Sequence, residues 1–168
     1  MATDNFKPIE IDEIDKEILD LLQQDGKITI TKIAEKVSEK LGKTKSATAI
    51  RARVQKLEEV LIKKYVALID CRYLGYREMV MASLRVNSKQ PIEDIKNKIE
   101  KMEKIKYGYI VTGEYPLFVM AKCMDHEDSM ELIKQLRNLP GVEEVKTQIV
   151  LDRIKEDTTI IIPELENK

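Results

Sequence analysis

The spacing of apolar residues divides this chain of 168 residues into two parts, and this division limits the folds that the chain can adopt. Between residues 11 and 61, apolar residues recur at the intervals of three and four that mark one face of an α-helix. From residue 79 onward, stretches with a period of two alternate with stretches of helical period. The pattern predicts an all-helical N-terminal part followed by a part that mixes strands and helices.

Three helices are predicted in the first part. The first has acidic residues in its first turn and stops at Asp25-Gly26; Thr29 can cap the second, and Ser46 or Thr44 can cap the third. Their apolar stripes are, in order, Ile11, Ile14, Ile18, Leu21 and Leu22; Ile30, Ile33, Ala34, Val37 and Leu41; and Ile50, Val54, Leu57 and Leu61. Three short helices that each bury one stripe are typical of a helix-turn-helix unit.

The third helix is basic on the side opposite its stripe. That side has no carboxylate before Glu58, and its residues are Lys45, Thr48, Arg51, Ala52, Gln55 and Lys56. Residues 26–57 contain nine Lys and Arg residues but only two Glu, whereas the whole chain has a net charge of −1. A local positive block on an otherwise acidic chain indicates a phosphate-binding face. A solvated surface helix would also give such a pattern.

The second part reads strand, helix, strand, strand, helix, strand. The predicted strands are residues 79–86, 107–112, 117–124 and 142–151; one helix begins at Pro91, and another begins at Asp125 or His126 with Met130, Ile133 and Leu136 inward. This order is the ferredoxin-like βαββαβ arrangement. Residues 64–70 are rich in β-formers and predict a strand that links the two parts. The predicted organisation is residues 1–62 as a DNA-binding domain, 63–76 as a linker strand, and 77–168 as a ferredoxin-like domain with a C-terminal tail.

Several stretches resemble the Lrp/AsnC family of transcription regulators, the feast/famine proteins of bacteria and archaea. Residues 11–19, 22–28, 32–34 and 51–59 are similar to its DNA-binding half, and residues 109–113 and 145–151 to its effector and assembly domain. The resemblance implies an α+β fold, with a three-helix winged/helix-turn-helix domain before a ferredoxin-like βαββαβ domain. Two features depart from the family pattern: a longer segment between Ala34 and Thr44, and Ala52 beside Arg53 where paired basic residues are common.

If the third predicted helix binds DNA, the residues around it make two kinds of contact, one with bases and one with phosphates. Outward residues near the start of a helix in the major groove read bases, while neighbouring cations and capping groups hold phosphates. The expected base-reading residues are Lys45, Ser46, Thr48, Arg51 and Gln55, and the expected phosphate contacts are Thr29, Thr31, Lys32, Lys43 and Lys56. Arg53 lies closer to the apolar stripe and is expected to be structural.

The family resemblance also implies a small-molecule effector, often an amino acid, bound between subunits. The positions that match the family's pocket are Thr112, Gly113, Glu114, Tyr115 and Thr147. Pro116 stands where the family often has an acidic residue. Strands with apolar residues on both faces favour sheet-to-sheet self-association, so we expect a homodimer that binds pseudo-palindromic double-stranded DNA. The family resemblance implies that such dimers assemble further.

Other classes of function find little support. The chain has one histidine, His126, and no recognisable nucleophile motif, phosphate loop or metal-ligand spacing, so we expect no enzyme activity, cofactor or metal. Cys71 and Cys123 lie in apolar runs and are expected to be buried thiols. With no signal peptide or membrane span, a cytoplasmic location is expected. Two alternatives remain open: an ACT-like metabolite-binding subunit, and a tetrapyrrole decarboxylase related to the same family.

Overall fold

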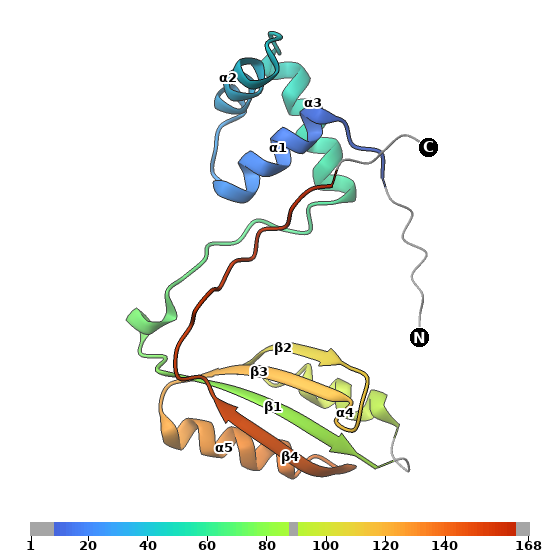
Figure 1. Cartoon of the computed structure of the whole chain (residues 1–168), viewed down its shortest axis with the longest axis vertical. Helices are drawn as coiled ribbons and strands as arrows, with labels where there is room; N and C mark the ends of the chain where they lie inside the picture. Colours follow the sequence, from blue (N-terminus) through green and yellow to red (C-terminus); the bar gives the residue numbers. More distant parts are fainter. Residues whose placement is uncertain (1–8, 88–90, 164–168) are drawn as a thin grey trace. The chain divides into compact units, whose positions relative to one another are not determined.

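The computed structural model describes residues 9–87 and 91–163, which form two compact units (Figure 1). One unit contains the chain up to residue 68 together with the residues from 157 onward, and the other contains residues 69–156. Residues 1–8, at the start of the predicted DNA-binding domain, and residues 164–168, at the end of the predicted tail, lie outside the described residues. We call the two parts the helical unit and the mixed unit.

The helical unit has the three predicted helices. They are α1 (Glu13–Gln24), α2 (Ile30–Leu41) and α3 (Ala47–Val60). Asp12, Thr29 and Ser46 cap their N-termini, each with a side-chain oxygen that accepts a backbone N–H. The three apolar stripes meet in one core, whose fully buried centre includes Ile18, Ile33, Val37 and Ile50. The predicted caps at Thr29 and Ser46 are therefore correct.

The linker differs from the predicted strand. Residues 63–70 are exposed and have no assigned secondary structure, and a short 3-10 helix, Cys71–Leu74, follows them. Asp70 caps this 3-10 helix, and Gly75 ends it with a φ of 89°, a conformation that glycine adopts without strain. A strand needs a hydrogen-bonded neighbour, and no ladder includes residues 63–76 within the described chain. No strand lies between α3 and the first strand of the mixed unit, so the described helical unit has no wing.

The C-terminal tail belongs to the helical unit, although the sequence assigned it to the second domain. Ile162 is 6% exposed and packs in the core formed by the three helices. The side-chain amide of Gln23 on α1 donates to the Ile160 carbonyl at 3.1 Å and accepts the Ile160 N–H at 2.8 Å. Apolar periodicity shows that the tail can be buried, but it does not specify which of two cores receives it.

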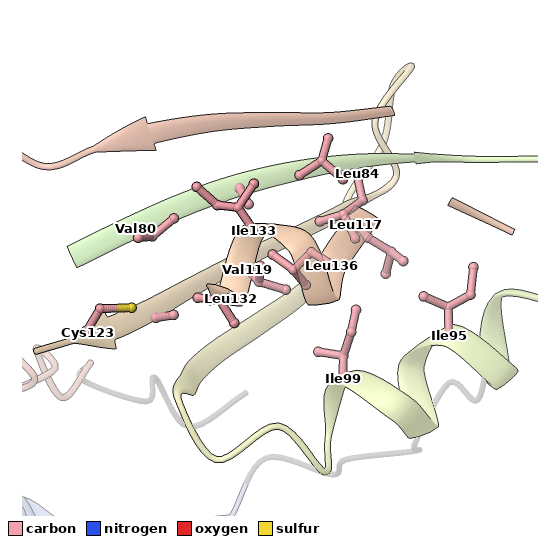
Figure 2. Close-up of a cluster of buried hydrophobic side chains, with 13 residues drawn as sticks. Val80, Leu84, Ile95, Ile99, Leu117, Val119, Cys123, Leu132, Ile133 and Leu136 are labelled. Carbon is pink, nitrogen blue, oxygen red and sulfur yellow. The ribbon is translucent and has the colours of Figure 1, made fainter. Parts of the chain in front are cut away.

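The mixed unit has the predicted ferredoxin-like order. Its elements are β1 (Glu78–Val86), α4 (Ile92–Ile99), β2 (Ile105–Ile110), β3 (Leu117–Cys123), α5 (His126–Arg137) and β4 (Val142–Ile149). The strands form one antiparallel sheet in the order β2-β3-β1-β4. Side chains from α4, α5 and one face of the sheet form the core, in which Val80, Leu84, Ile95, Val119 and Leu136 are labelled (Figure 2).

One predicted core position on α5 is wrong. Met130 is 40% exposed, whereas Ser129 and Leu132 are buried together with Ile133 and Leu136. Positions 129, 132, 133 and 136 follow the helical spacing of three and four, so they form one continuous stripe. The predicted set of 130, 133 and 136 has steps of three only, and such a set drifts around the helix.

The other face of the sheet, which we call the open face, is defined by the alternation of side chains along paired strands. Its residues are Met79, Met81, Ser83 and Arg85 on β1; Tyr107 and Tyr109 on β2; Phe118, Met120 and Lys122 on β3; and Glu144, Lys146 and Gln148 on β4. The rings of Tyr107 and Tyr109 stack with their centroids 6.5 Å apart. The open face therefore has an aromatic edge on β2, a Met-rich centre on β3 and β1, and a charged edge on β4.

Candidate nucleic-acid interface and effector site

Helix α3 is fixed to the helical unit along one side. Ile50, Val54 and Leu57 are buried in the core. On the flank of this stripe, the Arg53 guanidinium donates to Asp12 at 2.7 Å and to Asp15 at 2.8 Å. These two carboxylates also form the capping box at the start of α1. Arg53 therefore joins α3 to the first turn of α1, which is the structural role expected for it.

The opposite side of α3 is exposed and free of acidic partners. Thr48, Arg51, Gln55 and Lys56 are exposed, and Ser46 caps the helix before them. Within residues 9–87 and 91–163, neither Arg51 nor Lys56 makes an ion pair. The amide of Gln55 has one long contact, 3.5 Å, to Glu59 on the same helix. This side of α3 thus offers donors and cations to an external ligand.

The remaining predicted DNA-contacting residues lie on α2 and on the turn that follows it. Thr29, Thr31 and Lys32 are exposed in the first turn of α2, and Lys43 is exposed after its end. Lys45 is half-buried and directly precedes the N-cap of α3. The predicted residues therefore form two groups, one on α3 with its preceding turn and one at the start of α2.

Two basic residues of the positive block are neutralised inside the unit. Lys40 forms an ion pair with Glu17 of α1, which raises the pKa of Lys40. Burial by itself raises the pKa of Asp12. Hydrogen bonds from the Asp15 N–H and the Arg53 guanidinium together lower that pKa by more than burial raises it, so the net pKa lies below its ordinary value. Because Arg53 and Lys40 are used internally, the charge left for phosphate comes from the other basic residues of the block.

The predicted effector residues lie around the connection between β2 and β3. Thr112, Gly113 and Glu114 are exposed there, and Tyr115 is half-buried. Gly113 has a φ of 115°, which only glycine adopts readily. Any other residue at this position would strain the turn, so the short connection depends on this glycine.

Three of the predicted effector residues do not share one environment. The Glu114 carboxylate accepts from the Arg85 guanidinium at 3.1 Å, and the Lys146 ammonium lies 4.0 Å from the centre of the Tyr115 ring. Thr147 pairs with Ala82 of the buried core, so it projects to the helix-covered side of the sheet. The structure thus brings Glu114 and Tyr115 together and separates Thr147 from them.

Sequence reasoning missed two basic residues at this charged edge. Arg85 also pairs with Glu144 at 2.9 Å and approaches Glu143 at 3.6 Å, and Lys146 covers Tyr115. Alternation along residues 79–86 places Arg85 on the face opposite Val80, Ala82 and Leu84. A lone charge within an apolar strand was the available signal, but pairing across strands becomes visible only once the register is known.

The cysteines and the histidine lie where the sequence predicts. Cys71 and Cys123 are free and buried, and burial raises the pKa of the Cys123 thiol. His126 is the first residue of α5, directly after the cap Asp125. In the described part of the chain, no three His, Cys, Asp or Glu side chains cluster in a way that could hold a metal ion. The same residues include no helix with the length and apolarity needed to cross a membrane.

A three-helix unit with an exposed basic helix, joined to a ferredoxin-like unit, defines a helix-turn-helix transcription regulator with a ligand-binding domain. Residues 11–58 match the AsnC-type helix-turn-helix domain, and residues 79–160 match the Lrp/AsnC ligand binding domain. The chain belongs to the Lrp/AsnC family. The family assignment is thus the one that the sequence motifs indicated.

Relatives match nearly the whole length of the chain. It is 32% identical over 155 residues to the HTH-type transcriptional regulator FL11 of Pyrococcus horikoshii, covering 92% of this chain and 98% of that one. It is 31% identical over 150 residues to an uncharacterized HTH-type transcriptional regulator of Pyrococcus furiosus, and the match covers 89% of this chain and 97% of that one. A solved structure of a transcriptional regulator from Neisseria meningitidis in complex with L-Met superposes with a TM-score of 0.82 at 22% identity. The superposition covers 90% of this chain and 96% of that one.

Proposed function

We propose that this chain is a sequence-specific DNA-binding transcription regulator that reads pseudo-palindromic sites with α3. The observation that carries the proposal is the division of α3 into a side buried through Ile50, Val54 and Leu57 and an exposed side that has no acidic residue before Glu58. A helix held on one side can enter the major groove with the other. Base contacts are assigned to Lys45, Ser46, Thr48, Arg51 and Gln55, and phosphate contacts to Thr29, Thr31, Lys32, Lys43 and Lys56.

We propose that the working form is a homodimer joined through the open face. One recognition helix reads only a few base pairs, so a second copy is needed for useful affinity. Tyr107 and Tyr109 are half exposed on this face and lie beside Phe118 and Met120 across the β2–β3 pair. Aromatic and Met side chains are enriched in the cores of protein interfaces. Two copies would separate their recognition helices by about 34–36 Å or a multiple of that distance.

We propose that a small molecule of the amino-acid type modulates DNA binding through the mixed unit. Two findings support this: the match of residues 79–160 to a ligand binding domain, and the L-Met complex of the Neisseria regulator. The charged edge beside the β2–β3 connection carries Arg85 and Glu114, which pair with each other at 3.1 Å. A ligand with a carboxylate and an ammonium group would exchange this exposed pair for one contact to each of its own charges. Thr112, Gly113 and Tyr115 complete the proposed set, and Thr147 is left out of it because it projects to the helix-covered side of the sheet.

The test is selection of sheared genomic DNA by the purified protein, with and without a pool of amino acids, followed by sequencing. We expect enrichment of pseudo-palindromic sites upstream of genes and a changed pattern in the presence of the pool. Lack of enrichment at low salt would contradict the DNA-binding proposal. Enrichment that the pool leaves unchanged would contradict the amino-acid effector while leaving the regulator intact.

A non-enzymatic role in the cytoplasm is part of the same proposal. The relatives named above are transcriptional regulators, and the proposed target is chromosomal DNA. The tetrapyrrole alternative predicts haem-like absorption of the purified protein, which an absorption spectrum would reveal. The ACT-like alternative predicts metabolite binding without retention on DNA, and the selection experiment separates it from the proposed regulator.

A further inference from the structure

The turn between α2 and α3 contains a lysine on each side of Thr44. Gly42 closes α2 with a φ of 63°, and no atom lies within 4 Å of the position that its Cβ would occupy. Lys43 and Lys45 then lead to Ser46, the N-cap of α3. This turn therefore borders open space at its start and sets where the recognition helix begins.

A single hydroxyl group ties the turn to α2. Ser38 Oγ donates a hydrogen bond to the Ala34 carbonyl at 2.6 Å and accepts the Lys45 N–H at 2.8 Å. Because the hydroxyl proton is committed to Ala34, the oxygen keeps its lone pairs for Lys45. Serine is otherwise an unfavourable residue in a helix interior. Ser38 thus anchors the residue just before the cap of α3 to the last turns of α2.

The two lysines of the turn keep their charge available. In the part of the chain that the structure describes, neither Lys43 nor Lys45 pairs with an acidic side chain. Lys40, one turn earlier, differs because Glu17 neutralises it. Two unneutralised cations therefore lie beside the start of α3, on a turn whose main chain is held in place.

We propose that residues 42–46 form a phosphate-binding turn and that Ser38 is the positioning residue that holds it. The proposal rests on the DNA-binding function above and deepens it, because it reassigns Lys45 from base reading to phosphate contact. Since the Lys45 main chain is fixed to α2, a phosphate held by Lys43 and Lys45 fixes the depth of α3 in the groove. Ser38 then acts on DNA only through these two lysines.

The experiment compares the full chain with Ser38→Ala, Ser38→Thr, the double variant Lys43→Gln/Lys45→Gln, and the combined triple variant. Dissociation constants are measured at several salt concentrations for the duplex enriched from genomic DNA and for a random-sequence duplex of equal length. The lysine variant is expected to lower the slope of log affinity against log salt by about 0.9 for each lost phosphate contact, on both duplexes.

The serine variants test positioning. Ser38→Ala is expected to weaken binding to both duplexes by about fivefold, the effect of losing one neutral hydrogen bond. Ser38→Thr keeps the hydroxyl and is expected to restore binding. In the background that lacks Lys43 and Lys45, Ser38→Ala is expected to have no further effect, because the two changes remove one and the same contact.

One control and three contrary results complete the test. Lys98→Gln/Lys101→Gln removes the same charge from exposed positions of the mixed unit and should leave the salt slope unchanged. Equal losses from Ser38→Ala in both backgrounds would show that it acts through folding, and would overturn the positioning role. Loss confined to the enriched duplex in the Lys43→Gln/Lys45→Gln variant would assign these lysines to base reading and overturn the phosphate-binding turn. Failure of the unmodified chain to bind either duplex at low salt would overturn the DNA-binding function itself.

Discussion

At the scale of single residues, two arginines one helical half-turn apart on α3 have opposite roles. Arg53 is paired with Asp12 and Asp15, whereas Arg51 is exposed and has no acidic partner in the described chain. Their side chains are identical, so their substitutions form a matched pair. Substitution of Arg53 should change stability, and substitution of Arg51 should change DNA recognition.

Arg53→Gln is expected to destabilise the helical unit by about 1–2 kcal/mol at neutral pH, because Asp15 is nearly buried and loses its cation. The pKa of Asp12 is lowered in the fold, so its contribution is present above its ordinary value of 3.8 and is lost as the pH falls through the folded-state value. The free energies of unfolding of the Arg53→Gln variant and the unmodified chain, measured in urea, should therefore converge in acid.

Arg51→Gln is the control, and its free energy of unfolding is expected to lie within about 0.5 kcal/mol of that of the unmodified chain. A difference for Arg53→Gln that stays constant down to low pH would contradict the ion-pair explanation.

Arg51→Ala should weaken binding to the enriched duplex about tenfold or more, while binding to a random duplex changes far less. A bidentate contact to guanine contributes about 1–3 kcal/mol of discrimination and little to non-specific affinity. Competition binding with the two duplexes measures both quantities in one series. Equal losses on the two duplexes would assign Arg51 to phosphate instead.

At the scale of elements, the C-terminal tail is a structural part of the DNA-binding unit. Ile162→Ala is expected to destabilise α1 to α3 by about 2–4 kcal/mol, because it removes a buried branched side chain from a packed core. Native-state hydrogen exchange of the helix amides reports this unit separately from the mixed unit. The neighbouring Ile161→Ala is the control, since Ile161 is 96% exposed. Equal effects of the two substitutions would contradict burial of the tail in this core.

The elements also show what the sequence could and could not predict. Helices, strands and caps were predictable because periodicity and capping chemistry are local properties, as Thr29 and Ser46 illustrate. The destination of Ile162, the cross-strand pairing of Arg85, and the Ser38 hydrogen bond to Lys45 depend on which segments meet in space. Residues 63–70 failed as a predicted strand because strand propensity does not supply a partner.

At the scale of the whole molecule, the open face and the recognition helices are linked through the proposed dimer. Met120→Glu introduces a charge at the centre of the open face, between β1 and β2, without touching the core on the other side. We expect sedimentation to show a monomer, because burying an unpaired carboxylate in an interface is costly. Met130→Glu is the control: it makes the same change on the exposed side of α5 and should leave the dimer intact.

The same variant predicts a distinct effect on DNA binding. With one recognition helix per particle, affinity for the complete pseudo-palindromic site should fall about a hundredfold, since the second half-site is no longer bound at high effective concentration. Affinity per subunit for a duplex with a single half-site should change little, because α3 and its surroundings are unaltered. A monomeric variant that still binds the complete site with full affinity would contradict the dimer as the DNA-reading form. A variant that stays dimeric would instead assign the subunit contact to another surface.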